Sequence, residues 1–210
     1  IIAGYPWFLD WGRDSLLAFE GLLLIPRRFE IAKEVLLTMV RDTKFGLVPN
    51  GYSGYDNRPL YNSSDASLLL FEQVQKYIDY TGDYKFVKEY LYDVLENIID
   101  SYCGKIDVDE NNIYLDGDGL ISSGTENTQN TWMDVKYDGK AITPRNGKTV
   151  ELNAMWYNAN MIMMDLTRKM GHFIKANKYK ELAENCKFSW NLKFYNEERN
   201  CLYDVIRRWR

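Results

Sequence analysis

The sequence has almost no histidine. His172 is the only one among 210 residues, which excludes any site that needs two histidines and argues against a zinc site or a Ser–His catalytic pair. Because His172 follows Gly171 at the end of a predicted helix, where the helix dipole stabilises an imidazolium, it is interpreted as structural. We expect no metal and no cofactor, and acid–base chemistry therefore has to come from carboxylates.

Cysteine and long apolar runs are also scarce. Cys103, Cys186 and Cys201 are an odd number without the spacing of a disulfide framework, which indicates reduced thiols in a cytoplasmic protein. No apolar run reaches the roughly 18 residues of a membrane span. The first residues, 1–4, lack the charged start of a signal peptide. We expect a cytoplasmic protein with no membrane partner.

Positive charge is not in excess either. The net charge is −4 and Lys and Arg form no stripe, which argues against nucleic acid as a partner. Aromatic residues, in contrast, make up 15% of the chain, with 16 tyrosines. This composition suits a site where ligand rings stack on aromatic side chains.

Apolar spacing predicts an all-α fold. The predicted helices cover about residues 15–24, 28–40, 66–80, 84–98, 152–170 and 177–194. Segments 66–71 and 160–164 are apolar nearly all round and predict buried helices, whereas segment 178–182 is amphipathic and predicts an outer helix. Short turns alternate with long segments, 41–65 and 103–150, and the second contains strand-like stretches at 112–115 and 141–143. The alternation predicts an array of α/α hairpins with its long loops at one end.

Three clusters of aromatic and acidic residues each precede a predicted buried helix, at residues 5–14, 52–65 and 129–158. They should therefore meet at one mouth. An indole can stack on the C–H face of a sugar, and Arg and carboxylates can bind its hydroxyls in pairs. The pattern indicates a site that processes glycans.

Simpler interpretations exist for several of these residues. Asp14 and Asp65 can act as helix N-caps alone, and Trp156 and Tyr157 fit a helix core. The segment 116–119, Asp-Gly-Asp-Gly, lacks the spaced ligands of a calcium loop and favours a turn. Glycoside hydrolysis requires an acid to protonate the leaving oxygen, and Asp134, in the longest loop, is the candidate.

Within these clusters the chain resembles the amylo-α-1,6-glucosidase domain of glycogen debranching enzymes. The resemblance rests on Tyr-Pro-Trp-Phe-Leu-Asp-Trp-Gly-Arg-Asp at 5–14, on 131–136, on 143–148 and on 151–158. It implies an (α/α)6 toroid of the glucoamylase type and inverting hydrolysis of the α-1,6-linked glucose of a branched α-glucan such as a glycogen limit dextrin. By the same resemblance, Asp134 takes the position of the general acid. The implied substrate-binding residues are Trp11, Arg13, Asp14, Tyr61, Asn62, Asp65, Trp132, Lys136, Glu151 and Asn153.

The toroid has twelve helices and only six are predicted here. We therefore expect residues 1–210 to form about half of the domain, with further sequence on both sides, and the family's general base to lie beyond residue 210. The isolated chain would then be inactive. The end of the chain, 205–210, departs from the family pattern. Two alternatives remain open: another toroid hydrolase, such as a glucoamylase or trehalase, and a non-catalytic helical module that binds glycans.

Overall fold

The computed structural model describes residues 10–207, so residues 5–9 of the first aromatic cluster and the last three residues lie outside the described part. The chain divides into two compact units at residues 100 and 101. The division falls within helix α5 (Tyr92–Cys103). Each unit is described by itself.

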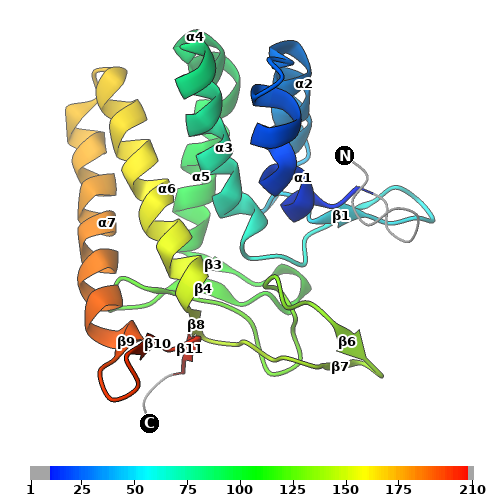
Figure 1. Ribbon diagram of the computed structural model, residues 1–210, viewed down its shortest axis with the longest axis vertical. Coiled ribbons are helices and arrows are strands. Elements are labelled where there is room, and N and C mark those ends of the chain that lie inside the picture. Colours follow the sequence, from blue (N-terminus) through cyan, green and yellow to red (C-terminus); the bar gives the residue numbers. More distant parts are fainter. Residues whose placement is uncertain (1–9, 208–210) are drawn as a thin grey trace. The chain divides into compact units, whose positions relative to one another are not determined.

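The first unit consists of helices and one short hairpin, which extends to the side of α1 (Figure 1). Its elements are α1 (Gly12–Phe19), the π-helical turn η1 (Glu20–Leu24), α2 (Phe29–Arg41), β1 (Gly51–Tyr52), β2 (Pro59–Leu60), α3 (Ala66–Thr81), α4 (Tyr84–Phe86), the π-helical turn η2 (Val87–Leu91) and the start of α5. Helix α1 continues directly into η1 and packs on α3, and α2 packs on η1 and α3. Strands β1 and β2 pair antiparallel.

Helix α3 is the most buried helix of this unit, as its apolar sequence predicts. Leu68 to Phe71 are all buried, and Tyr77 is completely inaccessible. The helix ends at Gly82, whose φ of 68° is the left-handed conformation that favours glycine. Asp83 then caps the next helix by accepting a hydrogen bond from the Phe86 amide at 3.1 Å. One helix therefore ends and the next begins within two residues.

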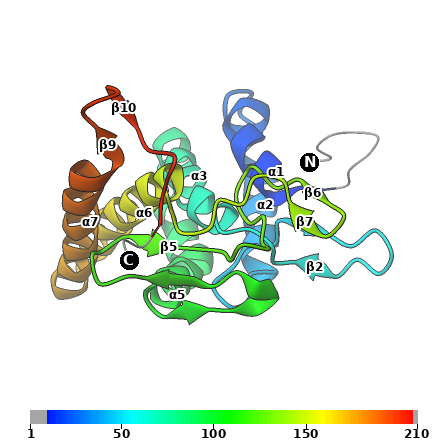
Figure 2. The ribbon, with the colours of Figure 1, turned by 90° about the horizontal axis from the view of Figure 1, so that it is seen from below.

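The second unit combines a helical pair with small antiparallel sheets (Figure 2). Its elements after α5 are β3 (Lys105–Ile106), the 3-10 turn η3 (Val108–Glu110), β4 (Ile113–Leu115), β5 (Ile121–Ser122), β6 (Lys136–Tyr137), β7 (Lys140–Ala141), β8 (Lys148–Thr149), α6 (Val150–Lys169), α7 (Phe173–Phe194), β9 (Tyr195–Asn196), β10 (Cys201–Leu202) and β11 (Val205–Ile206). Strands β3, β4 and β5 form one sheet, and β8 pairs with β11. Residues 205–206, at the end of the described part, thus form an ordered strand.

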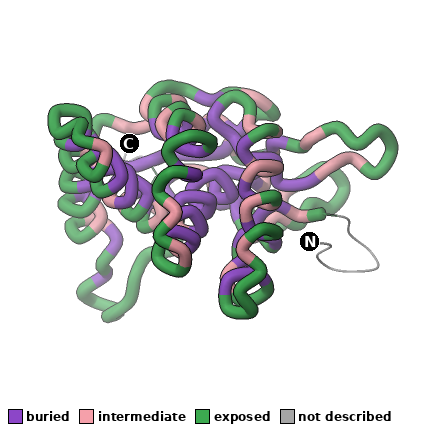
Figure 3. The backbone as a smooth tube through the Cα atoms, turned by 90° about the horizontal axis from the view of Figure 1, so that it is seen from above, coloured by how far each residue is buried: buried purple, intermediate pink, exposed green. Residues whose placement is uncertain are grey.

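Helices α6 and α7 lie side by side and form the core of this unit (Figure 1). Trp156 is completely buried and stacks on Tyr102, with ring centroids 6.0 Å apart and an interplanar angle of 12°. On α7, Ala176, Tyr179 and Ala183 are buried at helical spacing. Buried and exposed positions alternate along the helices, so each helix keeps an inward face (Figure 3).

The helix-rich class predicted from apolar spacing is confirmed, whereas the toroid stays a prediction. The first helix begins at Gly12 and the last at Phe173, both earlier than predicted. The predicted core position of Trp156 and the turn at 116–119 are confirmed. The strand-like stretch at 112–115 forms β4, but only Ala141 of the stretch 141–143 lies in a strand. Within residues 10–207, no helix is long and apolar enough to cross a membrane, and no group of three or more His, Cys, Asp or Glu residues is arranged to hold a metal ion.

Candidate functional site

The start of α1 is fixed by close contact with the segment before β1. The Gly12 amide donates a hydrogen bond to the Asn50 carbonyl at 2.8 Å, and Trp11 forms a β-bridge with Gly51. A Cβ atom on Gly12 would lie 2.2 Å from the Pro49 carbonyl oxygen, so only glycine fits. This contact begins the helix at Gly12. Asp14 is therefore not the N-cap but an exposed residue of the first helical turn.

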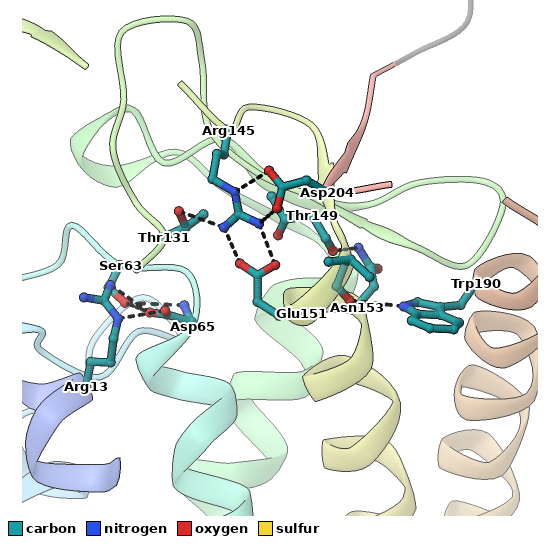
Figure 4. A network of polar contacts seen from close by, with 11 residues as sticks. Arg13, Ser63, Asp65, Thr131, Arg145, Thr149, Glu151, Asn153, Trp190 and Asp204 are labelled. Atoms are coloured by element: carbon teal, nitrogen blue, oxygen red, sulfur yellow. Dashed lines mark hydrogen bonds and ion pairs between the residues drawn. The ribbon is translucent and has the colours of Figure 1, made fainter. Parts of the chain in front are cut away.

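Arg13 and Asp65 form a buried ion pair that links α1 to the start of α3 (Figure 4). Nε of Arg13 donates to Oδ2 of Asp65 at 2.8 Å, and Nη2 donates to Oδ1 at 3.1 Å. Their side chains are only 8% and 4% exposed. The planar fork that would bind two sugar hydroxyls is thus occupied by a carboxylate of the protein, and the structure gives Arg13 a structural contact.

Asp65 occupies the N-cap position of α3 without capping the helix through its side chain. Ser63 takes that role, because its Oγ accepts a hydrogen bond from the Ala66 amide at 3.1 Å. The Ser63 hydroxyl also donates to Oδ1 of Asp65 at 2.5 Å. The Asp65 carboxylate therefore neutralises Arg13, and the interpretation of Asp65 as an N-cap by its side chain is wrong.

Tyr61 and Asn62, the other candidates of the first unit, occupy different environments. Tyr61 is buried, donates its hydroxyl to the Asp42 carbonyl at 2.8 Å and meets the Phe45 ring edge-on. It therefore anchors its loop to the end of α2. Asn62 is half-buried, and its side-chain oxygen is buried with no hydrogen-bond partner among the described residues.

Trp11 faces a pocket between α1, α2 and β1. The pocket has a volume of about 260 Å³. It is lined by Asp10, Trp11, Gly12, Ser15, Glu34, Val35, Thr38, Met39, Pro49 and Tyr52. Arg13, Tyr61 and Asp65 are not among these residues, so the candidates of the first unit do not share this pocket.

In the second unit, Arg145 connects several candidate residues (Figure 4). Its Nη1 and Nη2 donate to the two carboxylate oxygens of Glu151, the second at 2.7 Å. Its Nε and Nη2 donate to Asp204 at 3.0 and 2.6 Å, and Nη1 donates to Oγ1 of Thr131 at 3.3 Å. The Arg145 side chain is 3% exposed. Burial opposes the charge of Arg145, but the hydrogen bonds that it donates to Glu151 and Asp204 outweigh burial and raise the pKa of Arg145.

Trp132 is also in contact with Arg145. The guanidinium carbon lies 5.9 Å from the centroid of the indole ring, within cation–π range. The ring is nevertheless largely accessible, since Trp132 is 54% exposed. Trp132 and Glu151, both predicted from the sequence, are thus brought together by one arginine.

Asp134 and Lys136 follow Trp132 on the same loop. Asp134 is half-buried and has interactions of its own, and Lys136 is exposed at the start of hairpin β6–β7. Strand β6 pairs with β7, with Lys136 opposite Ala141. The candidate acid therefore lies between an exposed indole and the base of an exposed hairpin.

Asn153, another candidate, is completely buried in the first turns of α6. Its side-chain oxygen accepts from the Ile121 amide at 2.6 Å, and its amide group donates to the carbonyls of Ile121 and Thr149 at 3.0 and 2.9 Å. These contacts use both side-chain donors. The structure therefore shows Asn153 binding β5 to α6.

The turn at 116–119 is held by lysines. Lys148 contacts Asp116 at 2.8 Å and Asp118 at 2.7 Å, and Lys193 contacts Asp118 at 2.5 Å. The hydrogen bond from Lys148 lowers the pKa of Asp116. The acidic pair is therefore neutralised by protein cations, as expected for a structural turn.

The sequence alone assigns no role to Arg145. It stands inside one of the motifs that carry the family resemblance, but its partners lie 6, 14 and 59 residues away. The available signal was a single arginine between two groups of candidate residues. Only the folded structure shows that Arg145 contacts residues of both groups.

Comparison with known proteins agrees with the motifs. The family model for amylo-alpha-1,6-glucosidase matches residues 1–209. The glycogen debranching enzyme of Saccharomyces cerevisiae (strain ATCC 204508 / S288c) is 26% identical over 223 aligned residues, which cover 80% of this chain and 14% of that protein. The chain thus spans only a small part of this relative's length. Because the family match covers almost every residue, this chain belongs to the amylo-α-1,6-glucosidase family of glycogen debranching enzymes.

Proposed function

We propose that this chain is part of a glycoside hydrolase that removes the α-1,6-linked glucose at glycogen branch points with inversion of configuration. Family membership supports the reaction class. The observation that carries the proposal is the cluster in the second unit, where an exposed indole lies beside an arginine that holds a carboxylate. Such a cluster offers one sugar an indole on which its ring can stack and carboxylate oxygens that accept hydrogen bonds from its hydroxyls.

In this proposal Asp134 protonates the glycosidic oxygen as the bond to the sugar breaks. Trp132, two residues earlier, stacks on the glucose ring, and Lys136 donates to a hydroxyl. Glu151 accepts hydrogen bonds from sugar hydroxyls. Both of its oxygens already accept from Arg145, which leaves it poorly suited to take a proton from water. We therefore propose, following the family resemblance, that the general base comes from sequence beyond residue 210.

The proposal includes the (α/α)6 toroid, of which the helices described above would form about half. It also includes a cytoplasmic location, supported by three cysteines that form no disulfide, and a branched α-glucan as the partner. In the first unit, Trp11 faces a pocket, Asp14 is exposed, and the half-buried Asn62 has an unpartnered side-chain oxygen, so these three candidates keep a surface or an acceptor for a ligand.

The test is hydrolysis of a phosphorylase limit dextrin, with maltose and trehalose as competing substrates. It compares this chain with the longest natural protein that contains it. Release of glucose from the limit dextrin by the longer protein is expected, with the β-anomer appearing first in the proton NMR spectrum because inversion converts α to β. Initial α-glucose would contradict inversion. Preferential cleavage of maltose or trehalose would favour a glucoamylase or a trehalase.

A second candidate function is glycan binding without turnover. It is favoured by the engagement of Glu151 with Arg145 and by the exposed aromatic rings of Trp132 and Tyr137. Stacking on exposed rings binds sugar without any catalytic group. Isomaltose binding without glucose release, in the longer protein as well as in this chain, would support it.

A further inference from the structure

We propose that Arg145 is a positioning residue that fixes both the Glu151 carboxylate and the Trp132 indole for sugar binding. This inference rests on the proposed function of the second unit. Arg145 is suited to the role because a guanidinium is planar, always charged and able to form two parallel bonds to one carboxylate. Its side chain is almost completely buried, so its own position is fixed by packing.

Glu151 would adopt another orientation without this arginine. It is the second residue of α6, where the backbone N–H groups of the first turn lack helical partners. A carboxylate there is attracted to those N–H groups and to the positive end of the helix dipole. No side chain caps α6 at Thr149. The two bonds from Arg145 hold the carboxylate of Glu151 toward the loop that carries Thr131 and Trp132.

The orientation of the Trp132 side chain is also weakly fixed by packing, because more than half of its surface is exposed. An exposed indole on a loop rotates among several rotamers unless something holds one face. The Arg145 guanidinium lies 5.9 Å from the ring centroid, and a cation attracts the negative face of the ring. One face is thereby held, and the exposed remainder is left available for a sugar.

Asp204 completes the arrangement from the far side of Arg145. It accepts from Nε and Nη2, and its own side chain is mostly exposed. Asp204 contacts neither Glu151 nor Trp132 in any described hydrogen bond, so it anchors the arginine without orienting the sugar-binding groups directly. Arg145 therefore has a positioning role, because it contacts the sugar-binding groups, whereas Asp204 has a structural role, because it contacts Arg145.

The experiment follows the indole N–H signals of the ¹⁵N-labelled chain by NMR, with the Trp132 signal assigned through Trp132→Phe. Arg145→Lys is expected to shift the Trp132 signal while the far-ultraviolet circular dichroism stays unchanged, since an ammonium cannot reproduce the fork. Arg168→Lys is the matched control, because Arg168 is exposed at the end of α6. An unmoved Trp132 signal in folded Arg145→Lys would overturn the proposal.

Two further variants keep the test decisive. Glu151→Gln retains the shape of the side chain but weakens the shared fork, so a smaller shift of the Trp132 signal is expected. No shift would overturn the proposal even if Arg145→Lys did not fold. Asp204→Asn should move the signal by no more than a small fraction of the Arg145→Lys shift, and an equal shift would reduce Arg145 to a structural tether.

Sugar binding is measured on the same samples by titration with isomaltose. The wild-type Trp132 signal should respond at millimolar concentrations, and Arg145→Lys should raise the Kd at least tenfold. Equal Kd values in the two proteins would overturn the positioning role. If isomaltose left the wild-type signal unchanged while Arg145→Lys moved it, the proposed function would fail and the orientation of Trp132 by Arg145 would stand.

Discussion

Replacing Asp65 by Asn tests the Arg13–Asp65 ion pair. The pair is almost completely buried, with two direct bonds and a third from Ser63. Removing one partner of a buried pair costs about 3–5 kcal/mol, because the other charge stays buried without compensation. The Asn oxygen can still accept one bond, but its NH₂ group faces a donor of Arg13. The expected loss of unfolding free energy is therefore near the lower limit, about 3 kcal/mol.

Urea unfolding followed by circular dichroism at 222 nm measures this loss as a lower midpoint at an unchanged slope. A loss of about 3 kcal/mol corresponds to a decrease in Tm of roughly 6–12 °C for a chain of this size. Asp14→Asn is the control, because it removes the same charge from an exposed position one residue after Arg13 and should change stability by less than about 0.5 kcal/mol. A loss below about 1 kcal/mol for Asp65→Asn would refute the reasoning.

The double substitution Arg13→Met with Asp65→Leu separates charge burial from packing. Replacing a buried ion pair by apolar residues of similar volume is often neutral or stabilising. The double variant should therefore be more stable than Asp65→Asn. Equal or lower stability would show that the geometry of the fork, and not the uncompensated charge, governs the cost.

Three other predictions concern the second unit. In a limit-dextrin assay of the longer natural protein, Asp134→Asn should lower kcat by about 10²–10⁴-fold and leave KM nearly unchanged, while hydrolysis of α-glucosyl fluoride, whose leaving group needs no proton, is spared. The pKa of Asp116 is lowered in the folded state, so its stabilisation is present above the unfolded pKa and is lost as pH falls through the folded pKa. Below about pH 4 the wild type should therefore lose stability more steeply than Asp116→Asn, as measured by urea midpoints. Burial raises the pKa of the Cys186 thiol to about 12, whereas Cys201 is exposed, so a thiol reagent at pH 8 should modify Cys201 in the folded protein and reach Cys186 only after unfolding.

The helices could be predicted because apolar spacing depends only on local sequence. Helix α3 begins and ends within one residue of its predicted bounds, since Gly82 marks its end. The start of α1 could not be predicted, because the contact of Gly12 with Pro49 sets it across 37 residues. The π-helical turns η1 and η2 could not be predicted either, since each directly continues a helix at the next residue.

The contacts that the candidate residues make could not be predicted from their types. The sequence singled out Trp132 and Glu151, and the fold places both on Arg145. It also singled out Arg13 and Asn153 as sugar ligands. In the fold, Nε and Nη2 of Arg13 donate to Asp65, and the amide group of Asn153 donates to the carbonyls of Ile121 and Thr149. Residue type indicates which bonds a side chain can make. The choice between a sugar hydroxyl and another part of the chain depends on tertiary contacts.

The pairing of β8 with β11 determines how helices α6 and α7 of the second unit can unfold locally. Val205 lies opposite Thr149 and Ile206 opposite Lys148, so the residues that follow α7 are fastened to the residues that precede α6. The helical pair is thereby a closed loop of chain, and α6 cannot separate from α7 without breaking this ladder. Amide protons of the ladder and of the two helices should then exchange with deuterated solvent in one cooperative opening, and not by fraying from either end.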